Sequence, residues 1–240
     1  MSSTITAHTR IGDIVLEHPA TMRLFERHNI DYCCGGHRTL AEACAHAGRQ
    51  ASDILPALQG LDAPAPEPLD PKVLAEGSLT ALIAHIESTH HAFTREELNR
   101  VAPLMEKVAR VHGPNHPELA RVAVLFTALY DDLMPHLQKE EQILFPFIRG
   151  LESGAPACDT CFGSVRGPIS VMQSEHEAAG DVLREIRELT RDYTLPDDAC
   201  GSFRSLYMGL QTLEQDLHLH IYLESHILFP RAADLETAKA

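Results

Sequence analysis

The 240-residue sequence has no excess of basic residues and no long apolar run. Lysine and arginine total 20 against 34 aspartates and glutamates, a formal net charge of −14, so the basic surface that binds phosphate backbones is missing. No segment reaches the roughly 20 apolar residues needed to span a bilayer, and the first twenty residues lack the apolar core of a signal peptide. We therefore expect a cytoplasmic protein that binds neither nucleic acid nor membrane.

Strand-like alternation of β-branched residues is also absent, which predicts an all-α fold. Helical periodicity runs through four long segments, at about 72–111, 117–150, 168–193 and 199–234. Turn-like sequences separate them: HGPNHP at 112–117, a stretch with glycine, proline and cysteine at 150–168, and TLPDD at 194–198. Four long helices with modest connections predict an up-down four-helix bundle, whose core can hold inward-facing ligands.

Proline marks a boundary between two parts of the chain. The sequence LDAPAPEPLDP at 61–71 contains four prolines, which exclude a helix there and favour an extended tether. Short apolar clusters between Gly and Pro breaks precede it and predict several short helices. We expect a small helical domain at 1–62, a linker at 63–71 and the bundle at 72–240.

Histidine is unusually frequent, with 15 copies, and four of its positions form a pattern. HLQKEEQILFP begins at His136 and HIYLESHILFP begins at His220, so each copy places a glutamate, Glu140 or Glu224, four residues after its histidine. This spacing stacks both side chains on one helix face, where one metal ion could take both. A single such pair is more often a hydrogen-bonded pair on a solvated face, but two matching copies favour a metal site.

The other two long segments each offer one histidine in an apolar stretch, His85 in LIAHIES and His176 in MQSEHEA. A lone histidine of this kind is more often a core residue than a ligand, yet here each of the four helices supplies one. Counting angles along a straight helix puts five neighbouring residues off these faces: His90, His91, Glu141, Glu175 and His226. We expect them to lie outside the ligand shell or at the surface.

Four imidazoles and two carboxylates form a mixed N/O donor set that suits iron or manganese better than structural zinc. Each glutamate can bridge two cations about 3.5–4 Å apart, so the set favours two metal ions. Six protein ligands leave coordination positions open, where oxygen, nitric oxide or hydroxide would bind.

This arrangement resembles the haemerythrin-like domain, and its motifs resemble those of the repair-of-iron-centres family of di-iron proteins. The family's HxxxEEQILFP, GPISVMxSEH and final HxxxE fall on residues 136–146, 167–176 and 220–224. The resemblance implies two non-haem iron ions held by His85, His136, His176 and His220, with Glu140 and Glu224 as bridges. Oxygen-carrying haemerythrins have a further histidine four residues after the third-helix histidine. Gly180 stands there, which weakens the oxygen-carrier reading.

The motif DYCCGG at 31–36 resembles that of the small ScdA-type domain that precedes the bundle in this family. With Thr39 as a helix-start signal, Cys33 and Cys34 could lie near a helix N-terminus, which would lower their thiol pKa values. We expect them to be the reactive thiols that pass or accept iron. Simple packing in a turn and a strained vicinal disulfide are the alternatives.

The remaining cysteines carry weaker signals. Cys158 and Cys161 form a CxxC motif in the connection between the second and third long segments. Three interpretations of this motif are left open: a redox pair, a partial metal site, and a surface loop without a role. Cys44 and Cys200 are expected to be small buried apolar residues.

The resemblance implies repair of iron–sulfur clusters damaged by oxidative or nitrosative stress, through iron release or relay, or with reduction of nitric oxide. Damaged iron–sulfur proteins would be the partners, a homodimer is left open, and so is whether turnover is catalytic. A haemerythrin-like sensor or carrier of oxygen or nitric oxide is the alternative. A ferritin-like oxidase is disfavoured because it uses ExxH at i,i+3 and more carboxylates.

Overall fold

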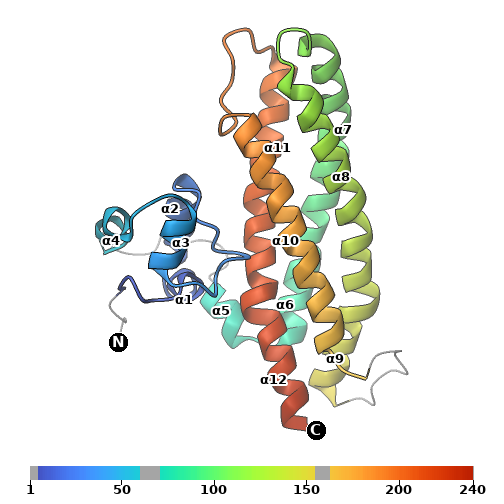
Figure 1. Ribbon diagram of the computed structural model, residues 1–240. Helices are drawn as coiled ribbons and strands as arrows, with labels where there is room; N and C mark the ends of the chain where they lie inside the picture. The colour runs from blue at the N-terminus through green and yellow to red at the C-terminus, as the bar shows by residue number, and fades with distance from the viewer. Residues whose placement is uncertain (1–4, 60–70, 155–162, 240) are drawn as a thin grey trace. The chain divides into compact units, whose positions relative to one another are not determined.

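The computed structural model describes residues 5–59, 71–154 and 163–239 (Figure 1). Within these ranges the chain is helical and has no β-strand, although an isolated antiparallel bridge joins Arg10 to Thr39. The all-α fold expected from the sequence is confirmed. The chain divides into two compact units, Ile83–His220 and a second unit that combines Met1–Leu82 with Ile221–Ala240.

The long helices run side by side in a bundle (Figure 1). They are α7 (Ala92–His112), α8 (Glu118–Lys139), α10 (Arg166–Leu189) and α11 (Gly201–Tyr222). Three of them adjoin a π-helical segment that leads to a further helix. These are η2 (Ile86–His91) between α6 (Leu79–His85) and α7, η3 (Glu140–Leu144) between α8 and α9 (Phe145–Ser153), and η4 (Leu223–Leu228) between α11 and α12 (Phe229–Lys239).

The breaks between the long helices fall where the sequence predicts them, at 112–117 and 194–198. The first predicted segment, 72–111, is not one helix. Gly77 and Ser78 separate α5 (Pro71–Glu76) from α6, and the Ser78 hydroxyl accepts a hydrogen bond from the backbone N–H of Ala81 at 3.1 Å. A serine that satisfies an otherwise unbonded N–H at a helix start explains why a new helix begins there.

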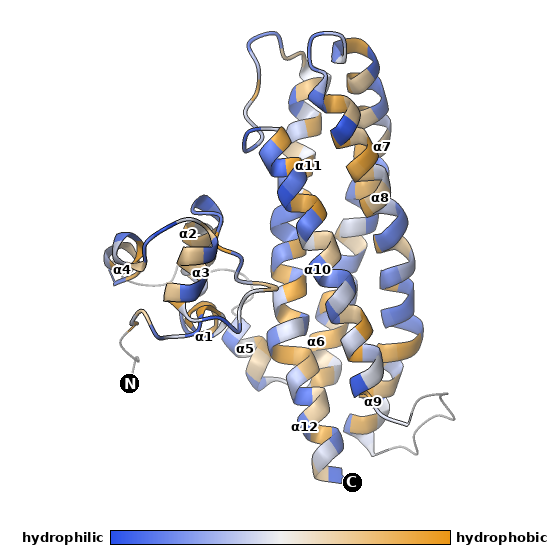
Figure 2. Ribbon diagram, in the orientation of Figure 1, coloured by the Kyte–Doolittle hydropathy of each residue, from blue (hydrophilic) through white to orange (hydrophobic). Residues whose placement is uncertain are grey.

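Apolar residues at helical spacing build the bundle core. In α7 the buried residues Leu98, Val101, Met105 and Val108 recur every three or four positions, which places them on one face. Burying each such side chain contributes about 1.5–3 kcal/mol. Figure 2 shows the same interleaving of apolar and hydrophilic residues along the other long helices. The contiguous cluster continues through α8, α10 and α11 with Leu119, Phe126, Leu133, Leu183, Ile186, Phe203, Leu210 and Leu217.

The side chain of Glu214 is a buried polar group within this core. Glu214 of α11 accepts hydrogen bonds from Arg187 Nε at 3.0 and 3.1 Å and from the Tyr193 hydroxyl at 2.7 Å. Burial and the neighbouring Glu214 carboxylate raise the pKa of Tyr193 far above its ordinary value, so the phenol stays a hydrogen-bond donor. These bonds join the end of α10 and its following turn to α11.

The second unit contains a set of short helices: α1 (Ile11–Glu17), η1 (Pro19–Thr21), α2 (Met22–Arg27), α3 (Leu40–His46), α4 (Ala51–Gln59) and α5. Their core includes Ile14, Phe25 and Leu40, which are buried. Thr39 starts α3 through a capping box with Glu42, in which each side chain bonds the other residue's backbone N–H. The helix-start signal predicted at Thr39 is therefore used.

The DYCCGG loop packs against the chain's final helical stretch within this unit. His226 Nε2 lies 2.6 Å from the Cys33 carbonyl oxygen, and the Tyr222 hydroxyl donates to the Gly12 carbonyl at 2.9 Å. A Cβ atom on Gly36 would lie 2.3 Å from His226 Nε2, so only glycine permits this approach. The loop is held by η4 (Leu223–Leu228), which contains His226.

None of the helices in the described ranges is both long enough and apolar enough to cross a bilayer. The predicted linker, apart from Pro71 at the start of α5, lies outside the described residues. The domain limits 1–62, 63–71 and 72–240 stay a prediction.

Candidate metal centre

Donor atoms from several helices converge on two adjoining groups in the bundle. In the first, His91 from η2, Glu140 from η3 and His220 from α11 bring one ligand atom each within 4.8 Å of one another. The Nε2 atoms of His91 and His220 are 3.2 Å apart, and His91 Nε2 is 3.4 Å from Glu140 Oε2. Two imidazole nitrogens at this separation, with a carboxylate beside them, are placed to bind one cation.

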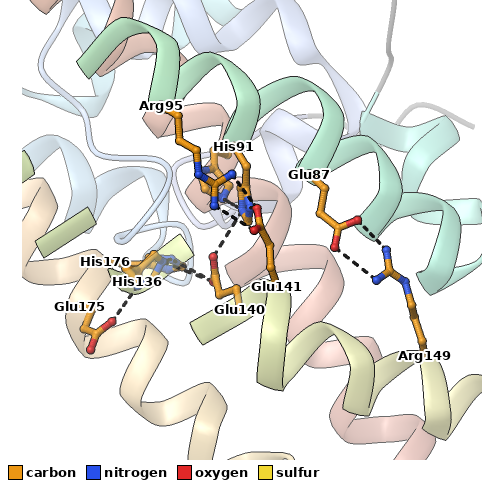
Figure 3. A network of polar contacts seen from close by, with 10 residues as sticks. Glu87, His91, Arg95, His136, Glu140, Glu141, Arg149, Glu175 and His176 are labelled. Carbon is orange, nitrogen blue, oxygen red and sulfur yellow. Dashed lines mark hydrogen bonds and ion pairs between the residues drawn. The ribbon is translucent and has the colours of Figure 1, made fainter. Parts of the chain in front are cut away.

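The second group repeats the first on the other side of Glu140. His136 and His176 bring their Nε2 atoms to 3.2 Å, and those atoms lie 3.4 and 4.0 Å from Glu140 Oε1. Figure 3 shows Glu140 between the two histidine sets. Glu224, one helical turn beyond His220, belongs to both groups as well. Two carboxylates shared by two histidine pairs form the donor set of a paired metal site.

Carboxylates outside the groups fix how two of the histidines point. Glu141 accepts from His91 Nδ1 at 2.8 Å and is clamped by Arg95 at 2.8 and 2.9 Å (Figure 3). Partial burial raises the pKa of Glu141, but the hydrogen bonds from Arg95 and His91 outweigh it and hold that pKa below its ordinary value. An ionised Glu141 cannot donate, so Nδ1 of His91 carries the hydrogen and Nε2 presents its lone pair inward.

Glu175 does the same for His136. It lies 2.7 Å from His136 Nδ1 and also pairs with Lys139. Burial raises the pKa of Glu175, but the hydrogen bonds from Lys139 and His136 dominate and lower it. Each of the two groups thus contains a histidine whose outer nitrogen is held by an ionised glutamate, an arrangement that increases the basicity of the inner nitrogen.

Glu140 and Glu224 are both 0% exposed. Removing a carboxylate from water costs several kcal/mol unless a cation or hydrogen-bond donors compensate it. The histidines that surround Glu140 offer lone-pair nitrogens at His91 and His136, which repel a carboxylate oxygen unless a cation lies between them. The residues present therefore fit a pair of divalent cations, and their nitrogen and oxygen donors, without sulfur, favour iron or manganese.

His85 does not join this site. The structure brings His91 into the first group, while His85 Nδ1 shares a hydrogen bond with Thr89 Oγ1 at 3.2 Å on a partly exposed face. Angle counting at 3.6 residues per turn put His91 about 240° from His85 and excluded it. The count was made from His85, which the structure leaves outside both groups, so it excluded the histidine whose face enters the site. The π-helical segment 86–91 lies between these two faces.

A signal for His91 was present in the sequence. The buried stripe of α7 includes Thr94 and Leu98, and His91 lies three and seven residues before them, which is the spacing of a single helix face. Extending that stripe backward selects His91. His85 belongs instead to the stretch around Leu82 and Ile86, where it falls between the buried positions.

The other residues expected outside the ligand shell do lie outside both groups in the described chain, and three of them, His90, Glu141 and Glu175, contact histidines of the site. His90 stacks on His220 with ring centroids 5.7 Å apart, and its Nδ1 lies 2.9 Å from Asp216 Oδ1. It therefore forms one wall of the site. His226 holds the DYCCGG loop.

Comparison with known proteins agrees with this geometry. The haemerythrin HHE cation-binding domain matches residues 81–232, and ScdA_N, a domain of unknown function (DUF542), matches residues 7–62. Two relatives are named iron-sulfur cluster repair protein YtfE, from Yersinia pseudotuberculosis serotype IB (strain PB1/+) and Yersinia pestis (strain Pestoides F). Each is 38% identical over 223 residues, which cover 92% of this chain and 95% of the relative. This chain belongs to the YtfE family of haemerythrin-like proteins. Its buried groups are able to hold the di-iron centre of that family.

The YtfE-family motif DYCCGG supplies a third group of potential ligands, made of Asp31, Cys33 and Cys34. Both thiols are reduced, with their sulfur atoms 3.9 Å apart, so the vicinal disulfide is not formed. The Cys33 thiol lies 3.2 Å from Asp31 Oδ1, which also accepts the backbone N–H groups of Cys33 and Cys34 at 3.1 and 2.9 Å.

The expected lowering of the pKa is wrong for Cys33. The hydrogen bond to Cys34, burial and the Asp31 carboxylate raise the pKa of Cys33 well above its ordinary value. The helix that Thr39 starts begins at Leu40, and the loop's hydrogen bonds run to Asp31 rather than to that helix end. Cys33 is therefore a neutral thiol in the absence of a cation.

The remaining cysteines divide into two kinds. Cys44 is buried as expected, but Cys200 is exposed, so its assignment as a buried apolar residue is wrong. It directly precedes α11, where its sulfur accepts backbone hydrogen bonds rather than apolar contacts. Cys158 and Cys161 lie outside the described residues.

Proposed function

We propose that the chain restores iron–sulfur clusters damaged by oxidative or nitrosative stress, with a di-iron centre in the bundle and the Cys33–Cys34 pair as the iron relay. The sharing of Glu140 and Glu224 by two histidine pairs carries the metal assignment. The names of the two Yersinia relatives, both iron-sulfur cluster repair proteins, support the repair role. Damaged iron–sulfur proteins would then be the clients.

In this proposal His91 and His220 hold one iron ion, and His136 and His176 hold the other. Glu140 and Glu224 bridge them. When bound, the iron pair supplies redox chemistry and open coordination positions for oxygen or nitric oxide. Glu141 and Glu175 keep the Nδ1 hydrogens of His91 and His136 in place, so that both rings stay in the tautomer that binds metal.

The thiol pair suits a relay because its protonation depends on a bound cation. A neutral Cys33 thiol is a poor nucleophile and a poor target for oxidation, which protects it between turnovers. A cation on its sulfur would displace the thiol proton. The exposed Asp31 carboxylate, with Oδ1 at 3.2 Å, could pass this proton on to water and so be ionised again as a ligand. Two sulfurs and a carboxylate then provide ligands that can compete with imidazole and carboxylate for the ion.

Within its own unit the DYCCGG loop is bonded to η4. His226 Nε2 lies 2.6 Å from the Cys33 carbonyl oxygen, and Glu224, a proposed bridging ligand, lies two residues before His226 on the same π-helical segment.

The double variant Cys33→Ala/Cys34→Ala tests the relay. It should keep the di-iron absorption spectrum and lose restoration of a damaged client cluster, because the thiols are not part of either iron group. Cys200→Ala is the matched control, since it removes an exposed thiol that belongs to neither site, and it should repair like the wild type.

The haemerythrin-like sensor or carrier predicts a different outcome. Under that function the double cysteine variant would bind oxygen or nitric oxide like the wild type, and neither protein would repair a client. Loss of the di-iron spectrum in the double variant would instead mean that the cysteines belong to the iron site. Binding of oxygen or nitric oxide, a cytoplasmic location and a homodimer stay predictions.

A further inference from the structure

A second cluster of potential metal ligands lies within the bundle unit, apart from the iron site. It gathers at the end of the bundle where the α7–α8 turn meets the loop before α11 (Figure 1). His112, His116 and Asp198 bring one ligand atom each within 4.8 Å of one another. The Cys200 sulfur lies beside this group and contacts His112, with Sγ 3.2 Å from Nε2.

The local fold brings these four residues together. His112 ends α7, and the turn HGPNHP closes with the backbone N–H of His116 donating to the His112 carbonyl at 2.9 Å, which sets the two rings one turn apart. Asp198 and Cys200 arrive from the loop that begins α11. The buried ring of Phe203 meets both imidazoles edge-on, with centroids 5.1 and 5.4 Å away, so both rings rest on a rigid wall of the core.

His116 is oriented by a carboxylate as His91 and His136 are. Its Nδ1 lies 3.2 Å from Glu118 Oε1, and its Nε2 lies 2.9 Å from Asp198 Oδ1. If His116 Nδ1 keeps its hydrogen and donates it to Glu118, a metal ion can replace the proton between Nε2 and Asp198. The Asp198 side chain is half exposed, which leaves the cluster open to a cation from solvent.

We propose that His112, His116, Asp198 and Cys200 form a second metal site that binds one zinc ion and ties the start of α11 to the α7–α8 turn. The set of two imidazoles, one thiolate and one carboxylate matches the nitrogen, sulfur and oxygen ligands of tetrahedral zinc. Its thiolate distinguishes it from the sulfur-free iron site. The two negative charges of Asp198 and a Cys200 thiolate balance the charge of Zn²⁺.

The thiolate is accessible near neutral pH. Backbone N–H groups at the start of α11 and the hydrogen bond from His112 lower the pKa of Cys200 to about 7. Zinc binding to this sulfur therefore displaces few protons. This inference is independent of the repair function, because none of its residues belongs to the iron groups or to the DYCCGG loop.

The test uses the full-length, iron-loaded protein and Co²⁺ as a spectroscopic probe for Zn²⁺. One equivalent of Co²⁺ should give tetrahedral ligand-field bands and a thiolate-to-cobalt charge-transfer band, both abolished by added Zn²⁺. Cys200→Ser should remove the charge-transfer band. Asp198→Asn should weaken zinc binding at least tenfold, whereas Asp197→Asn, a change at the neighbouring exposed aspartate, should bind like the wild type.

Two controls keep the result decisive. The Cys33→Ser/Cys34→Ser variant should retain the charge-transfer band, because the two thiols that it removes lie outside the proposed zinc site. An unchanged di-iron spectrum would show that each variant is folded. Because a bound ion stabilises the folded state, added zinc should raise the unfolding temperature of Asp197→Asn but not that of Asp198→Asn. A charge-transfer band that survives Cys200→Ser, or equal zinc affinity in the two aspartate variants, would overturn the proposal.

Discussion

Replacing Glu141 by Gln should weaken iron binding without unfolding the protein. Glu141 touches no proposed iron directly, yet it holds the Nδ1 hydrogen of His91 at 2.8 Å. Loss of such a carboxylate behind a metal-binding histidine typically lowers metal affinity about 10–100-fold. That range corresponds to about 1.4–2.8 kcal/mol of binding free energy.

Glu87 provides a closely matched control for this change. It pairs with Arg149 through both oxygens, at 3.2 and 2.7 Å, as Glu141 pairs with Arg95 (Figure 3). The two glutamate side chains are 28% and 29% exposed, and both arginines are 33% exposed. Only Glu141 also bonds a histidine of the site. Each variant should therefore lose the same small ion-pair contribution to stability, about 0–1 kcal/mol.

The assay is competition for iron with a colorimetric chelator, alongside thermal unfolding followed by circular dichroism. Glu141→Gln should release iron at a lower chelator concentration than the wild type, and Glu87→Gln should not. Unfolding temperatures of the two variants should agree when both are free of metal. Equal iron retention in the two variants would refute the idea that Glu141 acts through His91.

Three further outcomes are expected. His91→Ala should lose more iron than His85→Ala in metal analysis, because only His91 reaches the site, and equal losses would restore the straight-helix assignment. Removing the iron with a chelator should lower the unfolding temperature, since the buried carboxylates and imidazoles would lose the cations that compensate them. An unchanged temperature would contradict the fit argued above. Tyr193→Phe should lower the free energy of unfolding in urea by about 1–3 kcal/mol, because Glu214 loses a buried hydrogen bond. Tyr130→Phe, whose hydrogen-bond partner Asn99 is exposed, should lower it less. Equal losses would argue against a stabilising role for the buried bond.

The bundle was predictable from the sequence because its signals are local. Helical periodicity, Gly and Pro breaks and the repeated HxxxE spacing each depend on a few neighbouring residues, and they correctly indicated an all-α bundle with a histidine and glutamate core. The same signals selected His136, His176, His220, Glu140 and Glu224, which the structure brings together in two groups. Their role as iron ligands stays a prediction.

His91 was missed because the angles were counted from His85, which lies before the π-helical segment 86–91. A π-helical segment leaves no simple mark on composition, and the buried stripe of α7, counted backward, is the signal that selects His91. The pKa values of Cys33 and Cys200 could not be predicted from the sequence either, because they depend on the groups that the fold places around each thiol. The fold raises the pKa of Cys33 and lowers that of Cys200.

Anomalous diffraction at the iron absorption edge, from crystals of the purified iron-loaded protein, tests the central claim most directly. The account predicts two iron peaks about 3.5–4 Å apart, the distance typical of bridged metal pairs. One should lie beside His91 and His220, the other beside His136 and His176, and both should touch Glu140. A single iron peak, or a peak bound to His85 with His91 left out, would contradict it.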